Sequence, residues 1–154
     1  TGSVLTIWKG QLGRGEPLYV TDRRMTRFLL TLQDTVEFAV WATDAMQGGE
    51  VFIPGMKRAK LTDLAEAYAP GHPLTLGSIR PGGEKLHEDI ITVTESRRLY
   101  ARRSEDYCLE PEIHEWDGQR VPLGLFAFKE GFTLRSDTPP LATVAELQAM
   151  LREA

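Results

Sequence analysis

The sequence predicts a small mixed α+β domain built from short strands and three to four helices. Two patterns lead to this expectation. Apolar residues recur at helical spacing after Thr31, and short apolar runs bounded by glycine or proline, such as residues 51–53, are typical of short strands. The 154 residues suffice for one hydrophobic core, and a content of 42% hydrophobic and 26% charged residues excludes a largely disordered chain.

The N-terminal segment is expected to begin with a helix and continue into extended chain. The pattern predicts a short helix over residues 4–12, which ends in a turn rich in glycine. A short strand is predicted over residues 18–20, followed by a polar turn at 21–24. Residues 25–30 then form a second apolar stretch.

The strongest helix signal follows Thr31. This residue is a good N-terminal cap, and Asp34 lies three positions later. One face of the predicted helix carries Leu32, Val36, Ala39, Val40, Thr43 and Met46. Gly48 and Gly49 provide the left-handed turn that closes many helices. We therefore expect a long helix between Thr31 and these glycines.

The middle of the chain alternates predicted strands and helices. Residues 51–53 form a strand that Pro54 and Gly55 end, and Thr62 is expected to cap a helix over 63–69. A strand is predicted over 74–79, followed by a short helix over 84–91.

The remaining third has weaker periodicity. Strands at 99–103 and 107–109 are expected to pair as a hairpin, whereas residues 111–130 are expected to be rich in loops. Thr143 and Glu146 have the spacing of a capping box, which predicts a terminal helix reaching Leu151.

Composition narrows the function classes. The 18 basic and 22 acidic residues give a net charge of -4, so there is no overall electrostatic case for binding nucleic acid or a membrane surface. The single cysteine, Cys108, excludes an internal disulfide framework and favours a cytoplasmic location. His72, His87 and His114 lack the spacing of a metal site, so no metal is expected.

Two arginines stand in segments that suit an anion. Arg27 lies inside an apolar run, where a guanidinium needs an acid, a phosphate or solvent. Arg80 follows a predicted strand and precedes Gly82, Gly83 and a predicted helix start, a layout that offers backbone N–H groups to an anion. The alternative is structural ion pairing, such as Arg27 with Asp34.

Several strings occur in the order found in one enzyme family. They are Y-V-T-D-R-R-M-T-R-F at residues 19–28, G-E-V-F-I-P at 49–54, T-D-L-A at 62–65, I-R-P-G-G-E-K-L-H-E at 79–88, and the tail 134–151. The chain resembles the C-terminal half of the sugar-nucleotide dehydratases of polysaccharide biosynthesis. These are extended short-chain dehydrogenase/reductase proteins, typified by UDP-N-acetylglucosamine 4,6-dehydratase. The extra glycine before Glu84 departs from the family string.

The resemblance implies a nucleotide-sugar-binding subdomain over residues 1–110 and an extended tail with a terminal helix over 111–154. It also implies a substrate site for UDP-sugar. The residues that match this site are Met25, Arg27, Arg80 and Glu84. The family binds NADP in an N-terminal Rossmann half, which also carries a Tyr-x-x-x-Lys pair. No tyrosine of this chain precedes a lysine by four positions, so no cofactor and no independent dehydratase activity are expected here.

Three hypotheses follow from this resemblance. The chain is a UDP-sugar-binding portion, or it completes an NADP-dependent dehydratase with a separate Rossmann-domain partner chain, or it is a scaffold that self-associates. The third hypothesis needs exposed apolar surface. The candidates for that surface are Val4, Leu5, Ile7 and Trp8.

Overall fold

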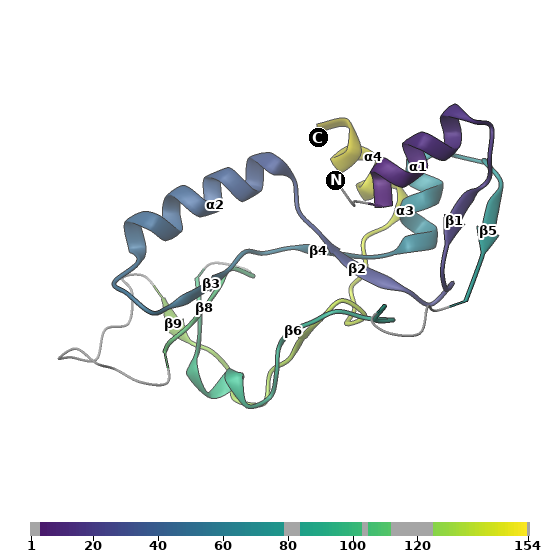
Figure 1. Cartoon of the computed structure of the whole chain (residues 1–154). Coiled ribbons are helices and arrows are strands. Elements are labelled where there is room, and N and C mark those ends of the chain that lie inside the picture. The colour runs from purple at the N-terminus through teal and green to yellow at the C-terminus, as the bar shows by residue number, and fades with distance from the viewer. Residues whose placement is uncertain (1–3, 79–83, 103–104, 112–124, 154) are drawn as a thin grey trace. The chain divides into compact units, whose positions relative to one another are not determined.

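The computed structural model describes residues 4–78, 84–102, 105–111 and 125–153. The described elements confirm a mixed α+β fold of helices and short strands (Figure 1). In chain order they are α1 (Val4–Gly13), β1 (Leu18–Val20), β2 (Thr26–Leu29), α2 (Leu32–Ala45), β3 (Val51–Ile53), β4 (Lys57–Lys60), α3 (Leu61–Tyr68), β5 (Leu74–Leu76), β6 (Asp89–Ile91), the 3-10 turn η1 (Glu95–Arg98), β7 (Leu99–Ala101), β8 (Tyr107–Leu109), β9 (Phe126–Ala127), β10 (Leu134–Arg135) and α4 (Val144–Glu153).

The chain divides into two compact units whose segments alternate along the sequence. Unit 1 comprises Thr1–Phe28, Arg58–Glu88 and Ser136–Glu153, and unit 2 comprises essentially Leu29–Lys57 and Asp89–Arg135. Both units contain residues from before and after position 110. The expected division into a binding subdomain over 1–110 and a tail over 111–154 stays a prediction.

Unit 1 is built around α1, α3, α4 and a parallel pair of strands. Strand β1 pairs with β5, with Leu18 opposite Leu74, and α3 packs against α4. Trp8 is completely buried, and its indole N–H donates to the Tyr19 carbonyl at 2.9 Å. The expectation that Trp8 contributes exposed apolar surface is therefore wrong, whereas Ile7 is exposed as expected.

Unit 2 contains a four-stranded antiparallel sheet in the order β3-β8-β7-β9. The predicted hairpin is present, with Leu99 opposite Leu109 across β7 and β8. Helix α2 contacts the sheet through Trp41, whose ring lies 5.3 Å from that of Phe52 in an edge-to-face arrangement. The aromatic edge of α2 therefore fixes the helix on this unit.

Two helix starts have the caps that the sequence indicates. The Thr31 side chain accepts from the Asp34 N–H at 3.0 Å at the start of α2. Thr143 and Glu146 form the expected box before α4, with distances of 2.8 Å and 3.3 Å between each backbone nitrogen and the other side chain. Both helices thus satisfy free N–H groups of their first turn.

Two expectations about helices are wrong. Helix α3 begins at Leu61, directly after β4, so Thr62 lies inside it and the N-terminal cap is Lys60 without a side-chain hydrogen bond. Residues 84–88 are not helical, and 89–91 form β6, which pairs with β10. Hydrogen bonds to distant segments explain this difference. The Thr26 N–H donates to the Leu86 carbonyl at 3.1 Å, in place of a helical bond.

The described helices are all too short or too polar to span a membrane. Residues 103–104 of the predicted hairpin, residue 79 of the predicted strand, and most of the expected loop region 111–130 lie outside the described residues.

The thiol of Cys108 is expected to resist modification in the folded chain. Cys108 is fully buried in β8, and burial, together with Glu50 and Glu110, raises the pKa of its thiol to about 12. Labelling with a disulfide reagent at about pH 8 should therefore require unfolding by guanidinium. The pKa of the thiol is higher in the folded chain than in the unfolded chain. The free energy of unfolding therefore falls only once the pH rises above the unfolded pKa, towards the folded value of about 12. Fast labelling of the folded chain would contradict this prediction.

Candidate functional site

Arg27 holds the segment that precedes β6. Its guanidinium donates to the Leu86 carbonyl at 3.2 Å and to the Lys85 carbonyl at 2.9 Å. Its Nε lies 3.3 Å from a Glu88 carboxylate oxygen. Arg27 therefore pairs with Glu88, rather than with Asp34 as the structural alternative supposed. With a side chain only 23% exposed, Arg27 fixes the backbone of residues 85–88 at the surface of unit 1.

A buried hydroxyl cluster also holds the same segment. Thr26 Oγ1 and Ser136 Oγ lie 2.7 Å apart, and both residues are at most 2% exposed. Thr26 Oγ1 also lies 2.8 Å from His87 Nδ1, and the Glu88 N–H donates to Ser136 Oγ at 2.8 Å. The segment around residue 87 is thus bound to β2 and to the chain at 136 by several hydrogen bonds.

Glu84 lies at the start of this segment, and the two oxygens of its carboxylate differ in their contacts. The Thr21 hydroxyl donates to Glu84 Oε1 at 3.0 Å. Its other oxygen, Oε2, is buried and has no hydrogen-bond partner among the described residues. A buried carboxylate oxygen without a donor is costly, so a hydrogen-bond donor brought to Oε2 would stabilise it.

The other two predicted site residues have different positions. Met25 is 1% exposed and belongs to the core of unit 1, where its carbonyl accepts from the Leu61 N–H. Arg80 lies outside the described residues. The structure thus brings Arg27 and Glu84 to the same segment. It adds Thr21, which sequence reasoning missed because the spacing of 63 residues to Glu84 leaves no local signal.

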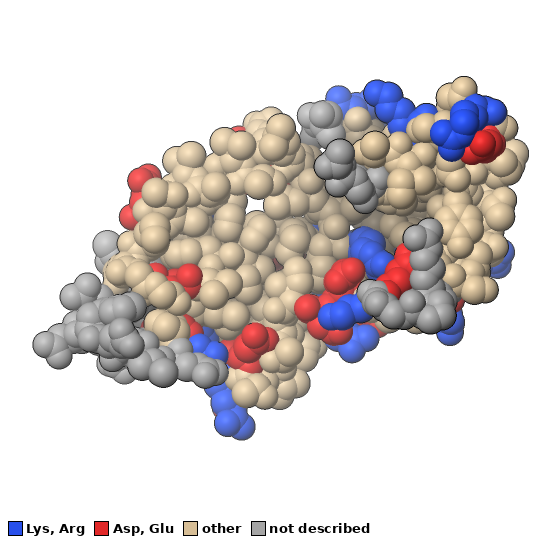
Figure 2. All heavy atoms as spheres, viewed as in Figure 1, with Lys and Arg blue, Asp and Glu red and all other residues tan. Residues whose placement is uncertain are grey.

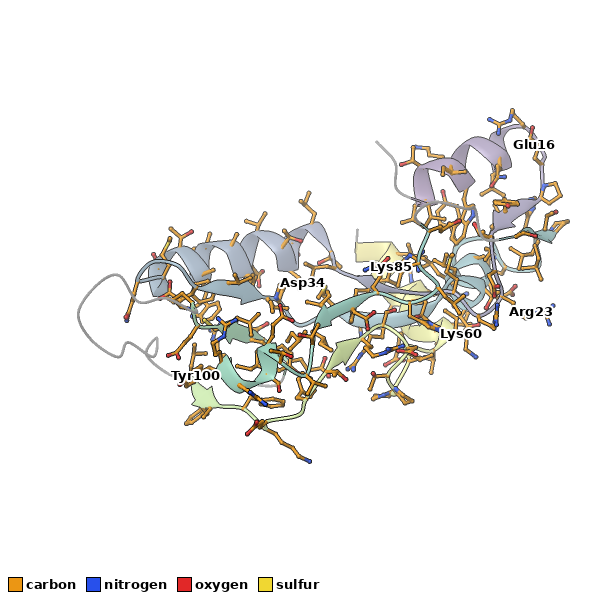
Figure 3. All side chains as sticks on the ribbon, turned by 60° about the horizontal axis from the view of Figure 1, so that its bottom comes forward. Glu16, Arg23, Asp34, Lys60, Lys85 and Tyr100 are labelled. Carbon is orange, nitrogen blue, oxygen red and sulfur yellow. The ribbon has the colours of Figure 1, made fainter. Side chains whose placement is uncertain are left out.

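Charged groups of both signs surround this segment. Lys85 is exposed, and the neighbouring turn contains Arg23, which points outward (Figure 3). On that turn Arg24 pairs with Asp22 at 2.8 Å, and the hydrogen bond from Arg24 lowers the pKa of Asp22 to about 2. The visible face of the molecule has basic and acidic atoms side by side rather than one basic field (Figure 2).

A cavity of about 310 Å³ lies in unit 2 beside α2. Among the described residues that line it, Arg102 is the one lysine or arginine. The Arg102 guanidinium carbon lies 4.1 Å from the centre of the Trp41 ring, and one of its nitrogens lies 3.6 Å from an Asp106 carboxylate oxygen. This cation is thus engaged by the protein itself, through an aromatic ring and a carboxylate. No group of metal ligands is found among the described residues, and His114 lies outside them.

Replacement of Ser136 by alanine should destabilise unit 1. The change leaves the buried Thr26 hydroxyl and the Glu88 N–H without this partner, which costs about 1–3 kcal/mol. The free energy of unfolding from a denaturant titration checks the prediction. Thr43→Ala, which removes an exposed hydroxyl bonded to the Ala39 carbonyl, is the control and should stay within about 0.5 kcal/mol of the original chain. Equal effects of both changes would refute a structural role for the buried cluster.

The fold of this chain is similar to that of a solved structure. The X-ray structure of Pen from Bacillus thuringiensis matches 99% of this chain with a TM-score of 0.84 and 25% sequence identity. This chain covers 46% of that structure's chain.

The family follows from the sequence comparison. A family model described as "Polysaccharide biosynthesis protein" matches residues 1–108, so this chain belongs to that family. This finding confirms the resemblance drawn from the motifs.

Individual relatives agree with this assignment. The UDP-N-acetylglucosamine 4,6-dehydratase (inverting) of Campylobacter jejuni serotype O:2 is 37% identical over an alignment 154 positions long, which covers 91% of this chain and 43% of the relative. The capsular polysaccharide biosynthesis protein CapD of Staphylococcus aureus is 34% identical over an alignment 125 positions long, which covers 73% of this chain and 21% of the relative. The chain thus spans less than half the length of these relatives.

Proposed function

We propose that this chain is the UDP-sugar-binding part of a nucleotide-sugar dehydratase- or epimerase-like protein of polysaccharide biosynthesis. The observation that carries the proposal is the buried Glu84 Oε2, which lacks a partner among the described residues beside a segment fixed by Arg27. The relative from Campylobacter jejuni, named for a UDP-sugar substrate, supports the choice of ligand class.

The chemistry of a UDP-sugar suits these groups. The ribose of UDP presents neighbouring hydroxyls, and the Glu84 carboxylate accepts hydrogen bonds from such donors. The diphosphate needs cations, for which Arg80 and the Arg27 guanidinium are the assigned residues. Arg27 uses several donors on backbone carbonyls, so its role is to hold the segment while its charge acts on the ligand. Because Met25 is buried in the core of unit 1, we assign it a packing role rather than a contact with the base.

In the part of the chain that the structure describes, the glycines near the N-terminus do not fit an NADP site. A dinucleotide-binding loop places its glycines between a strand and a helix. Here Gly10 and Gly13 belong to helix α1 itself, and Gly15 follows in a turn with a φ of 68°. We therefore assign NADP binding and the Tyr-x-x-x-Lys chemistry to polypeptide outside this chain, and we expect no dehydratase activity from this chain alone. A cytoplasmic location is part of the same proposal.

Titration calorimetry tests this function. The chain is titrated with UDP, with UDP-N-acetylglucosamine, and with NADP as the control. Saturable binding of both uridine ligands without binding of NADP is the expected result. Failure of both uridine ligands to bind would overturn the proposal that this part of the protein holds the nucleotide.

A further inference from the structure

Helix α2 presents an aliphatic face that the described part of unit 2 leaves uncovered. Leu32 is 77% exposed, Val36 54% and Val40 60%. These residues recur every fourth position, so they form one row along the helix. Figure 2 shows a largely uncharged surface where α2 lies in the view of Figure 1. Single exposed aliphatic residues are common, but an aligned row on one helix indicates a surface that another molecule covers.

The other side of α2 already has its contacts. Trp41 packs against Phe38 at 5.5 Å and against Phe52 at 5.3 Å between ring centroids. At about 100° per residue, Trp41 lies far around the helix from Val36. The helix is thus oriented by its aromatic side, and turning it to bury the aliphatic row would expose those rings. The aliphatic row is therefore a second apolar face of the same helix.

The relatives indicate what covers this face. This chain matches 43% of the Campylobacter jejuni dehydratase and 46% of the solved Pen chain, so more than half of each protein has no counterpart here. We propose that the aliphatic face of α2 binds the polypeptide that corresponds to this remaining part. Helix α2 contains acidic residues and no lysine or arginine. The complementary surface is therefore apolar at its centre with basic residues at its rim.

A comparison of thermal unfolding in two contexts tests this proposal, which stands independently of UDP binding. The first context is this chain alone. The second is a fusion that replaces the matching part of the Campylobacter jejuni relative with this chain, in the relative's order. The double variant Val36→Glu with Val40→Glu is measured in both, and Thr35→Glu is the control. Thr35 is exposed on the same helix, but it lies about 100° around the axis from Val36.

The double variant should leave the midpoint of the isolated chain almost unchanged, because both positions are exposed and glutamate is a good helix former. In the fusion it should lower the midpoint by about 5 °C or more, because two carboxylates enter an apolar contact. Thr35→Glu should leave both midpoints unchanged. An equal loss in both contexts, or no loss in the fusion, would overturn the proposal. Self-association of the isolated chain that the double variant abolishes would assign the face to a second copy instead.

Discussion

Replacing Trp8 by alanine is expected to lower the free energy of unfolding by about 3–5 kcal/mol, the usual cost of emptying the site of a buried aromatic residue. Trp8 is 0% exposed, and its ring lies 6.0 Å from that of Tyr68 on α3. Its indole N–H also donates to the Tyr19 carbonyl of β1. One side chain thus connects α1 to a strand and to a second helix, so its loss should loosen the whole of unit 1.

The neighbouring residue offers a matched control. Ile7 is 54% exposed in the same helix, so Ile7→Ala should cost less than about 1 kcal/mol. Trp8→Phe separates packing from hydrogen bonding, because it keeps an aromatic ring but leaves the Tyr19 carbonyl without the indole donor. A denaturant titration of the three variants measures these costs. Equal costs for Trp8→Ala and Ile7→Ala would mean that α1 is not part of the core.

Replacing Arg27 by alanine is expected to weaken UDP binding by about 1–3 kcal/mol, or about 5-fold to 150-fold in the dissociation constant. The change removes a positive charge from the site. It also leaves the Lys85 and Leu86 carbonyls without this donor and Glu88 without its ion pair. Calorimetry with UDP measures the effect. An unchanged affinity would refute the assignment of Arg27 to the site.

Two further variants distinguish charge from positioning. Arg27→Lys keeps the charge but loses the planar fork that reaches several acceptors. If positioning dominates, as the hydrogen bonds indicate, lysine should weaken binding nearly as much as alanine does. Arg24→Ala is the control, because Arg24 is 71% exposed in a surface pair with Asp22, and such pairs contribute little. Full affinity in Arg27→Lys would show that the charge alone matters.

The sequence predicted best where the signal was local. The cap at Thr31, the box formed by Thr143 and Glu146, and the β7–β8 hairpin all depend on residues a few positions apart. Strand β4 gave no signal, because its sequence K-R-A-K contains one apolar residue, Ala59, which is buried. Strand β4 pairs with β2, which lies far away in the sequence, so this pairing leaves no local signal.

The site was predictable only in part for the same reason. Arg27 and Glu84 stood out as charged residues in segments similar to the family's motifs, yet their partners could not be read from spacing. Glu88 lies 61 positions from Arg27, and it forms the ion pair with Arg27 that nearby Asp34 was expected to form. Long-range hydrogen bonds of this kind also removed the predicted helix over 84–91, because they occupy the backbone groups that a helix needs.

Nuclear magnetic resonance of the isotope-labelled chain during titration with UDP tests the central claim most directly. The account predicts saturable shifts of the backbone amides near Thr21, Arg27 and Lys85, with little change along α2. Glu84→Gln should reduce these shifts at equal ligand concentration, because an amide supplies only one oxygen where the carboxylate supplies two. Shifts confined to the cavity beside α2, or no shifts at high UDP concentration, would contradict the assignment of the nucleotide to this segment.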